Sequence, residues 1–415
     1  MLDLKFIREN QDLVQKKAEE KGFSVDVKKI VALDEQRRKL LQEIENLRSQ
    51  RNQKSKTKPT DAEITKLRRL GDDIKNSEAG LAKIEKELED LLQGVPNPAF
   101  DDVPVAKDES GNQVIKKWGE PTKFSFTPQD HVSLGEKLGL IDIERGTKVS
   151  QSGFYFLKNE GALLELALIN YVMGKLVKKG FVPVITPELV NEKIIGGTGY
   201  KARSEKERQI YKIEGEDLHL IATAEITLVG QHANEILEAK NLPLRYAGFS
   251  SCFRVERGSY GKDVRGIIRV HEFDKVEMVI FCKPEESKNF HEEFLAIEEE
   301  IFQELQIPYH VVLICSGDLG SAAAKKYDVE AWIPSQNKYR EVTSTSNTTD
   351  FQARRLNIKY KEKNLTELLH TLNGTACAIG RTIIAILENY QQKDGSVLIP
   401  GVLQSFMGKD KIELK

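Results

Sequence analysis

The sequence predicts an α+β protein in which an antiparallel pair of long helices precedes a larger domain of mixed helices and strands. Three observations support this prediction: two series of apolar residues at helical spacing before residue 95, a Gly- and Pro-rich segment that follows them, and short strand-like runs from about residue 114 onward. The length of 415 residues also favours two domains over one.

The two helices are indicated by apolar residues that recur mostly at steps of three, four and seven. The first series is Leu33, Leu40, Ile44 and Leu47, and the second is Leu67, Leu70, Ile74, Leu81, Ile84, Leu88 and Leu91. Pro59 and the polar run KSKTKPT interrupt the pattern, so we expect an antiparallel coiled-coil hairpin. Each arm of about 30 residues would reach roughly 45 Å. A hairpin of two helices is too thin to enclose an active site.

The predicted tip of this hairpin is strongly basic. Every charged side chain between Asn46 and Thr60 is a cation: Arg48, Arg51, Lys54, Lys56 and Lys58. Such a run is often a solvated loop, and it also suits contact with a phosphate backbone. The hairpin sequence by itself leaves both interpretations open.

The overall composition excludes some classes of protein without choosing a partner. Lys and Arg number 62 against 64 Asp and Glu, so affinity for a nucleic acid would have to come from local clustering. No segment resembles a membrane span or a signal peptide, which predicts a cytoplasmic protein without membrane contact. Four distant cysteines without a CxxC pair argue against a zinc site and a disulfide framework: Cys252, Cys282, Cys315 and Cys377.

A linker separates the hairpin from the larger domain. It contains one glycine and three prolines, Gly94, Pro96, Pro98 and Pro104, and it lacks periodicity. This predicts a hairpin domain at 1–105 and a larger domain at 115–415. Within the larger domain a Leu-rich helix is expected from Ala162 to Lys179, closed by Gly180 and followed by the strand FVPVITP.

Charged residues concentrate on a predicted β-hairpin between residues 247 and 281. GFSSCFRVE is expected as its first strand, RGSYGKDVRG as its loop and IIRVHEFDKVEMVIF as its second strand. Alternation puts Arg254 and Glu256 on one face of the first strand, and it groups five side chains on the second: Arg269, His271, Phe273, Lys275 and Glu277. Since burying unpaired charge is costly, that face is either exposed, which is commoner, or the floor of a polar pocket.

Three separated motifs then identify a family. The phrase CFRVERGSYGKDVRGIIRVHEFDKVEM, with Thr223-Ala224-Glu225 before it and NGTACAIGRTIIAILENYQ after it, resembles the seryl-tRNA synthetases, which are class II aminoacyl-tRNA synthetases. The resemblance covers nearly the whole chain, including the helical hairpin, LGEKLGLIDIERGTKVS, EVTSTSN and DFQARR. It implies an antiparallel sheet flanked by helices, a coiled-coil arm that binds tRNA, and an enzyme that attaches L-serine to tRNA(Ser) through a seryl-adenylate.

The resemblance also implies a set of ATP-binding residues. Arg254 would hold the α-phosphate and Arg381 the γ-phosphate, because preplaced cations stabilise the charge that builds as pyrophosphate leaves. Glu256 would lie near the adenine amino group and Phe273 would stack on the ring. Judged locally, a surface pair of Arg254 with Glu256 and a core position for Phe273 are the commoner outcomes. The implied ATP contacts are Arg254, Val255, Glu256, Phe273, Glu341, Val342, Thr343, Ser344 and Arg381, with Arg254 and Arg381 as catalytic residues.

Two of these residues match the family's positions for Mg²⁺, which would bridge the ATP phosphates. They are Glu341 and Ser344, whose oxygen atoms suit that hard cation. A spacing of three does not place both on one face of a regular strand. A bend near Ser344 is therefore required.

Serine recognition is implied for seven residues: Thr223, Ala224, Glu225, Arg254, Glu277, Asn373 and Thr375. Rejecting alanine requires groups that are left unpaired without a hydroxyl, and rejecting threonine requires a wall. Glu277 and Thr375 would recognise the hydroxyl, with Asn373 beside them. Thr223 and Glu225 would hold the amino group, and a helix N-cap is the alternative for Thr223. Many relatives have Ser in place of Thr375, and much of class II has Glu in place of Gly380.

The resemblance further implies a homodimer, through the helix 162–179 and the strand that follows it, and charging of tRNA(Sec) as well. We assign no general base to the transfer step, since a lone histidine such as His271 is more often structural. Two competing functions stay open. One is a ligase that aminoacylates a carrier protein, which tends to lack the hairpin. The other is a noncatalytic nucleic-acid-binding paralogue, which would be expected to have lost its phosphate-binding arginines.

Overall fold

The computed structural model describes residues 2–54, 61–200, 209–256 and 265–414, without the side chains of 54 and 61–63. The chain divides into two compact units, Met1–Pro98 and Ala99–Lys415. Residue 105, the predicted boundary, lies inside the second unit. The segment before it is tied there, because the Phe100 N–H donates to the Ala324 carbonyl at 2.9 Å and the Pro104 carbonyl accepts from the Ser316 N–H at 2.8 Å.

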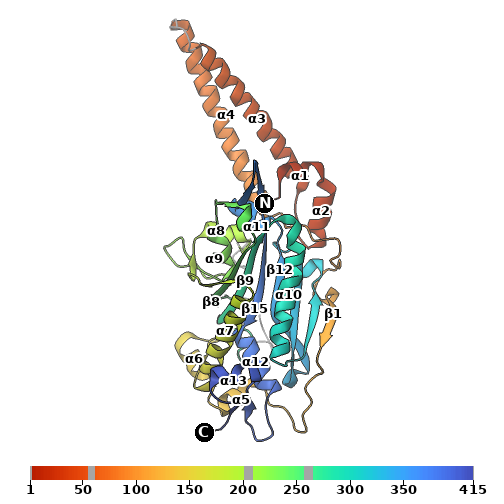
Figure 1. The fold of residues 1–415 in the computed structure, drawn as a ribbon. Coiled ribbons are helices and arrows are strands. Elements are labelled where there is room, and N and C mark those ends of the chain that lie inside the picture. The colour runs from red at the N-terminus through yellow and green to blue at the C-terminus, as the bar shows by residue number, and fades with distance from the viewer. Residues whose placement is uncertain (1, 55–60, 201–208, 257–264, 415) are drawn as a thin grey trace. The chain divides into compact units, whose positions relative to one another are not determined.

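The first unit contains the two predicted long helices, α3 (Val27–Lys54) and α4 (Asp61–Gln93), which lie side by side (Figure 1). Each residue of the two predicted apolar series is buried or half-buried, so the pattern did mark the packing faces. Two short helices that the sequence analysis did not predict, α1 (Leu4–Glu9) and α2 (Gln11–Glu20), pack with the base of the hairpin. The predicted connection between the long helices lies mostly in residues 55–60, outside the described residues.

The second unit is built on an eight-stranded sheet in the order β1-β10-β11-β12-β15-β9-β8-β4. All neighbouring strands are antiparallel except β4 and β8, so the predicted antiparallel sheet is confirmed. The strands are β1 (Gln113–Trp118), β4 (Val182–Ile185), β8 (Leu244–Phe253), β9 (Glu272–Cys282), β10 (Tyr309–Leu313), β11 (Lys325–Ile333), β12 (Lys338–Asn347) and β15 (His370–Ala378).

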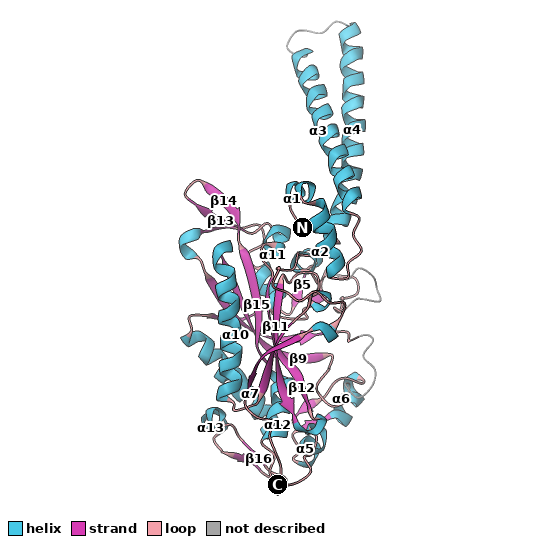
Figure 2. Cartoon of the chain, turned by 90° about the vertical axis from the view of Figure 1, so that its right-hand side faces the viewer, coloured by secondary structure: helices cyan, strands magenta, loops and turns pink. Residues whose placement is uncertain are grey.

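Helices flank this sheet, as predicted. The central strands share one large apolar core with α7 (Glu160–Lys178), α10 (Ser287–Glu304) and α12 (Ile379–Asn389), and α10 lies along the sheet in Figure 2. A second core joins β9 to α9 (Glu225–Gly230) and α11 (Phe351–Leu356). Among the described helices, none combines the length and apolar character needed to cross a bilayer.

The predicted charged hairpin is present as β8 and β9, but both strands are shorter at the loop end than expected. β8 ends at Phe253, so Arg254 and Glu256 follow the strand, and Glu256 has a positive φ of 49° that is incompatible with a continuing ladder. β9 begins at Glu272, so Arg269 and His271 are not on it. There the His271 N–H donates to Gly153 instead of to a neighbouring strand. Most of the predicted loop, 257–264, lies outside the described residues.

Candidate functional site

The main cavity lies where the end of β8 and the strands β9, β12 and β15 meet the start of α12. It is lined by Arg254, Glu256, Ile267, Ile268, Arg269, Val270, Phe273, Lys275, Glu341, Val342, Thr343, Thr375, Ala378, Gly380 and Arg381. The fold thus gathers residues of the segments 254–275, 341–343 and 375–381 around one cavity. The part of the predicted charged face that lies on β9 borders a polar pocket, since Phe273 and Lys275 line the main cavity and both Lys275 and Glu277 are buried.

Arg254 is held at the rim of the main cavity by its own backbone and by an aromatic ring. Its N–H donates to the carbonyl of His271 at 2.9 Å, and its Nε donates to the carbonyl of Ala222 at 3.3 Å. The guanidinium carbon lies 5.1 Å from the centre of the Phe273 ring. Glu256 pairs with Arg269 at 3.3 Å, so the locally expected pair of Arg254 with Glu256 does not form in the described structure.

His271 has a structural use next to this arginine. Its Nδ1 lies 2.8 Å from the Tyr211 hydroxyl and 3.0 Å from the Arg254 carbonyl, and its ring stacks on Phe154. These contacts fix the turn that presents Arg254. They agree with leaving His271 without a role as a base.

Arg381 lies on the first turn of α12 and faces Glu341. Its Nη1 donates to the Glu341 carbonyl at 2.8 Å and lies 3.3 Å from Glu341 Oε2, while its Nε donates to the Ile268 carbonyl at 3.2 Å. The Glu341 side chain is 48% exposed, and against the opposing effect of desolvation the cations Arg381, Lys326 and Arg254 together lower the pKa of its carboxyl. Glu341 is therefore an anion held among three cations.

A β-bulge resolves the spacing of Glu341 and Ser344. Thr343 pairs with Val329 and Glu341 pairs with Glu330, so Val342 is an extra residue in β12. Ser344 pairs with Asp328, which lies two residues from Glu330 on the neighbouring strand. Because directly paired residues point the same way, Glu341 and Ser344 share a face. The irregularity that the spacing required is therefore present. It lies at Val342, directly after Glu341 and two residues before Ser344.

The shared face opens into an acidic recess lined by Asp318, Asp328, Glu330 and Glu341, together with Lys326, Arg340 and Arg381 among others. Burial raises the pKa of Asp328 to about 7, against the opposing effect of Lys326. Asp328 Oδ1 is buried and has no hydrogen-bond partner among the described residues. The recess shares Glu341 and Arg381 with the main cavity, so the two form one polar region.

Thr375 lines the floor of the main cavity, and Glu277 lies directly beside it. They are directly paired on β9 and β15, and the Thr375 hydroxyl donates to Glu277 Oε2 at 3.1 Å. Lys275, which shares their face, lies 2.5 Å from the same Oε2. All three side chains are buried.

Glu225 and Asn373 lie in an inner recess, also lined by Tyr200 and Ser346. Glu225 accepts hydrogen bonds from Asn373 Nδ2 at 2.9 Å, Tyr200 at 2.7 Å and Gln352 at 2.6 Å. Burial, reinforced by the charge of Glu277, raises the pKa of Glu225 to about 7. Since Asn373 and Thr375 are two residues apart on one strand face, about 7 Å, the inner recess adjoins the main cavity.

The side chains of the remaining predicted residues are engaged elsewhere or do not line the main cavity. The Thr223 hydroxyl accepts from the Glu225 N–H at 3.2 Å, a local bond between residues two apart. The N-cap of α9 is Ala224, so the N-cap alternative for Thr223 is wrong. Ala224 and Val342 are buried in apolar cores, and the Thr343 hydroxyl donates to Glu298 on α10, behind the sheet. Val255 lies between Arg254 and Glu256 but does not line the main cavity.

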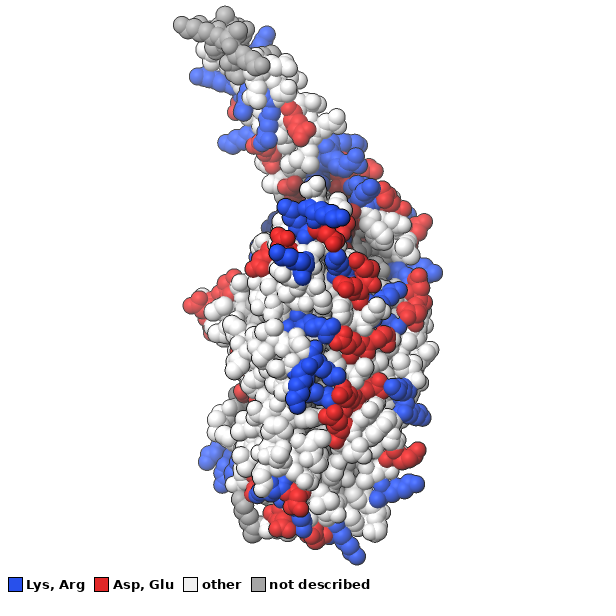
Figure 3. All heavy atoms as spheres, in the orientation of Figure 1, with Lys and Arg blue, Asp and Glu red and all other residues white. Residues whose placement is uncertain are grey.

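The predicted basic tip is described only in part. Arg51 is exposed, whereas Arg48 pairs with Glu78 of α4 at 2.7 Å. The run is therefore offset by an acid that is distant in sequence. Lys56, Lys58 and the side chain of Lys54 lie outside the described residues. Figure 3 shows Lys and Arg side chains gathered on the visible face near the described end of the hairpin.

Four residues of these recesses received no role from the sequence: Lys275, Asp328, Tyr200 and Gln352. The alternation pattern predicted the correct strand face for Lys275, but it could not show that Lys275 is buried and paired with Glu277. Asp328 reaches the site only through its register with Ser344. Tyr200 and Gln352 reach it through Glu225, and nothing in their local sequence marks that contact.

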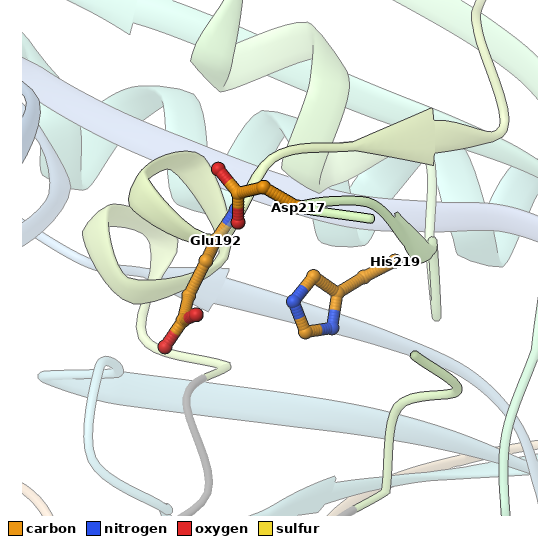
Figure 4. A group of neighbouring side chains, drawn as sticks. All are labelled: Glu192, Asp217 and His219. Carbon is orange, nitrogen blue, oxygen red and sulfur yellow. The ribbon is translucent and has the colours of Figure 1, made fainter. Parts of the chain in front are cut away.

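Glu192, Asp217 and His219 form a separate group whose ligand atoms lie within 4.8 Å of one another (Figure 4). None of them lines the main cavity. Asp217 Oδ1 accepts from the Glu192 N–H at 3.4 Å, and Glu192 begins α8 (Glu192–Thr198). Acidic side chains at a helix start are favourable without any metal, so this group is explained by local structure.

The antiparallel sheet, its flanking helices and the two arginines that line the main cavity are those of a class II aminoacyl-tRNA synthetase. Residues 209–390 match the model of the tRNA synthetase class II core domain (G, H, P, S and T), and residues 1–99 match that of the seryl-tRNA synthetase N-terminal domain. The serine–tRNA ligase of Rubrobacter xylanophilus is 48% identical over 420 residues, 99% of each chain. The chain belongs to the seryl-tRNA synthetase family, and the family resemblance predicted from the motifs is confirmed.

Solved structures agree with this assignment. The seryl-tRNA synthetase of Pyrococcus horikoshii complexed with ATP superposes with a TM-score of 0.93 at 43% identity, with all of both chains covered. The cytoplasmic serine–tRNA ligase of Naegleria fowleri in complex with AMP gives 0.89 at 35% identity, over 100% of this chain and 99% of that one. The predicted class of enzyme, an ATP-dependent aminoacyl-tRNA synthetase, is confirmed at the level of the family.

Proposed function

We propose that this chain activates L-serine with ATP and transfers the seryl group to tRNA(Ser), the reaction that the names of its relatives state. The observation that carries the proposal is the convergence of Arg254, Arg381 and Thr375 on one cavity, with Glu277 hydrogen-bonded to Thr375. Two cations suit a nucleoside triphosphate. A hydroxyl hydrogen-bonded to a carboxylate suits a small hydroxylated amino acid.

In the first step the serine carboxylate attacks the α-phosphorus and pyrophosphate leaves. Arg254 would hold the α-phosphate and the attacking carboxylate together through its planar fork. Arg381 would hold the γ-phosphate, and Phe273 and Glu256 would position the adenine. Val255, Val342 and Thr343 would border the nucleotide through their backbone. Since both guanidiniums are already fixed by backbone carbonyls, little reorganisation is needed as charge develops.

Mg²⁺ fits the acidic recess. Glu341 and Ser344 would hold it from one face of β12, and Asp328 adds a buried carboxylate oxygen without a partner in the described part of the chain. The ion would supply charge neutralisation across the phosphates. Arg381 borders both recesses, so it would orient the terminal phosphate beside that site.

Serine would lie with its amino group toward Glu225 and its side chain toward Thr375 and Glu277. An ionised Glu225 suits an ammonium group, and Thr223 and Ala224 fix the turn that begins α9. Asn373 donates to Glu225 and so orients that carboxylate. This arrangement separates recognition of the amino group from recognition of the hydroxyl.

The hairpin would bind tRNA through phosphate contacts from Arg51, the basic tip and the neighbouring face of α4. We include tRNA(Sec) as a second acceptor, as the family resemblance implies, and phosphate contacts do not exclude it because they carry no sequence information. The presence of the hairpin disfavours a ligase for a carrier protein. The presence of both arginines disfavours a noncatalytic paralogue.

We also propose that the protein is a cytoplasmic homodimer. Leu163 and Leu166 of α7 are 49% and 56% exposed, and Ile185 of β4 is 85% exposed. β4 is an edge strand, so its outer side offers unpaired backbone groups to a second copy. The four cysteines are free and buried, which suits a reducing compartment.

The direct test is ATP–pyrophosphate exchange measured with each of the twenty amino acids. Serine alone should stimulate exchange, and labelled serine should then be transferred to tRNA(Ser). Exchange with a different amino acid would refute the proposed substrate. Exchange with serine that is never followed by transfer to tRNA would favour another acceptor.

A further inference from the structure

Lys275 is a buried cation at the floor of the main cavity. It lies on β9, is 5% exposed, and lines the cavity together with Arg254 and Thr375. Lysine is rarely buried to this extent, because removing an ammonium group from water is costly unless it is paired and hydrogen-bonded. Its position in a substrate cavity therefore needs an explanation beyond packing.

Lys275 forms a closed triangle with the two residues proposed to recognise the serine hydroxyl. Its Nζ lies 2.5 Å from Glu277 Oε2 and donates to Thr375 Oγ1 at 3.3 Å. Thr375 in turn donates to the same Glu277 oxygen at 3.1 Å. The strand register fixes the triangle, since Lys275 and Glu277 share a face of β9 and Thr375 is the direct partner of Glu277 on β15.

The number of donors and acceptors determines what the triangle offers to a ligand. Thr375 has one proton, and it is given to Glu277. The ammonium of Lys275 has three N–H donors, and within the described residues two of them are engaged, one by Glu277 and one by Thr375. Glu277 accepts both of these bonds at Oε2, so Oε1 is its second acceptor. Counting only the part of the chain that the structure describes, one N–H of Lys275 and Oε1 of Glu277 thus remain for a ligand.

We propose that Lys275 determines specificity for serine by donating its third N–H to the hydroxyl oxygen of the bound amino acid. Glu277 accepts the hydroxyl proton, so the substrate hydroxyl is bound as acceptor and donor together. Alanine leaves a buried ammonium N–H and a carboxylate oxygen unpaired, which is far more costly than the loss of one neutral hydrogen bond. This inference rests on the proposed serine subsite.

A purely structural role makes a different prediction. If Lys275 only neutralised Glu277, its loss would disturb the whole cavity, including the neighbouring Arg254 and Phe273. The KM for serine and the KM for ATP would then rise together. If Lys275 contacts the hydroxyl, the effect falls on serine and on the choice between serine and alanine.

The test is steady-state pyrophosphate exchange with Lys275→Met, Lys275→Arg and a matched control, Lys325→Met. Lys325 is also a lysine of this sheet that pairs with a carboxylate, Asp102 at 2.6 Å, but it does not line the main cavity. Lys275→Met should lower the serine-to-alanine ratio of kcat/KM by about 10- to 100-fold, raise the KM for serine, and leave the KM for ATP within about twofold. Lys275→Arg should recover part of the ratio, and Lys325→Met should keep all of it.

Retention of the wild-type ratio by Lys275→Met would overturn the proposal, as would an equal rise of both KM values. If this variant does not fold, Lys275→Gln takes its place, because its amide keeps an N–H near the triangle. Its serine-to-alanine ratio should still fall below that of the wild type, and an unchanged ratio in this variant would overturn the proposal. A wild-type protein that activates another amino acid would refute the proposed function and this inference with it. Serine-specific exchange with an unchanged ratio in the variants would refute the role of Lys275 alone.

Discussion

The helical hairpin and the main cavity use charge in opposite ways. On the hairpin, Arg51 is exposed, and the Arg48–Glu78 pair is about half exposed on both sides. In the cavity, Lys275, Glu277 and Thr375 are buried and hydrogen-bonded to one another. Exposed charges act nearly independently and are screened by salt, whereas buried ones depend on every partner. Substitutions should therefore have small, additive effects on the hairpin and large, specific effects in the cavity.

The largest effect is expected for Arg254→Ala in the cavity. Removing a preorganised cation from the developing phosphoryl charge should lower serine-dependent pyrophosphate exchange by about a thousandfold. Arg245→Ala is the matched control, because Arg245 is an arginine of the preceding strand β8 that pairs with Glu293 and does not line the main cavity. Near-normal exchange by Arg254→Ala would remove the phosphate role from this residue.

A somewhat smaller effect, confined to tRNA, is expected when the hairpin is shortened. The distance from Leu40 Cδ1 to a Cβ placed on Gly80 is 3.9 Å, so residues 40–80 can be replaced by a short glycine loop. The base core with Ile30, Leu33, Leu88 and Leu92 is kept. Exchange should stay within about twofold, while kcat/KM for charging tRNA should fall by about a hundredfold, since several phosphate contacts are lost. A parallel loss of both activities would show that the hairpin supports the cavity instead.

The same contrast explains what the sequence could predict. The hairpin helices follow from periodicity, because each residue of the apolar series contacts a partner at a regular interval. The class of the second unit and most of its cavity residues follow from motifs recognised as those of a family. Periodicity is local in sequence and predicted local structure, whereas the motifs predicted which distant residues meet at the cavity through the family resemblance.

The remainder depends on pairing between distant segments. The spacing of Glu341 and Ser344 required an irregularity, but its position at Val342 and the position of Asp328 are set by strand register, which the sequence does not encode. The early ends of β8 and β9 follow from contacts of His271 with Gly153 and Tyr211. The pairing of Arg48 with Glu78 likewise required the second helix to be in place. Each of these features depends on a contact between residues far apart in the sequence, which local patterns do not reveal.

The buried charge of Glu225 predicts a pH dependence that the exposed hairpin charges lack. Its pKa is raised to about 7 by burial, and binding of an ammonium group requires the ionised form. Above pH 7 the carboxylate is already ionised and the KM for serine should be flat. Below pH 7 it must lose a proton on binding, so the KM should rise by about tenfold per pH unit. Glu225→Gln should have a higher KM without this slope, and an unchanged slope in that variant would assign the titration to another group.

The smallest effect is expected on the hairpin, where two neighbouring arginines should differ. Arg51→Ala should raise the KM for tRNA by about threefold. It should also reduce the slope of log binding constant against log salt concentration by about one, the value for one lost phosphate contact. Arg48→Ala should do less, because its guanidinium is already engaged by Glu78. Glu78→Ala should then strengthen tRNA binding, but only while Arg48 is present, since it frees that cation for a phosphate. Filter binding at several salt concentrations measures all three variants. Equal effects of Arg48→Ala and Arg51→Ala, with no gain from Glu78→Ala, would mean that the ion pair does not hold Arg48 away from the nucleic acid.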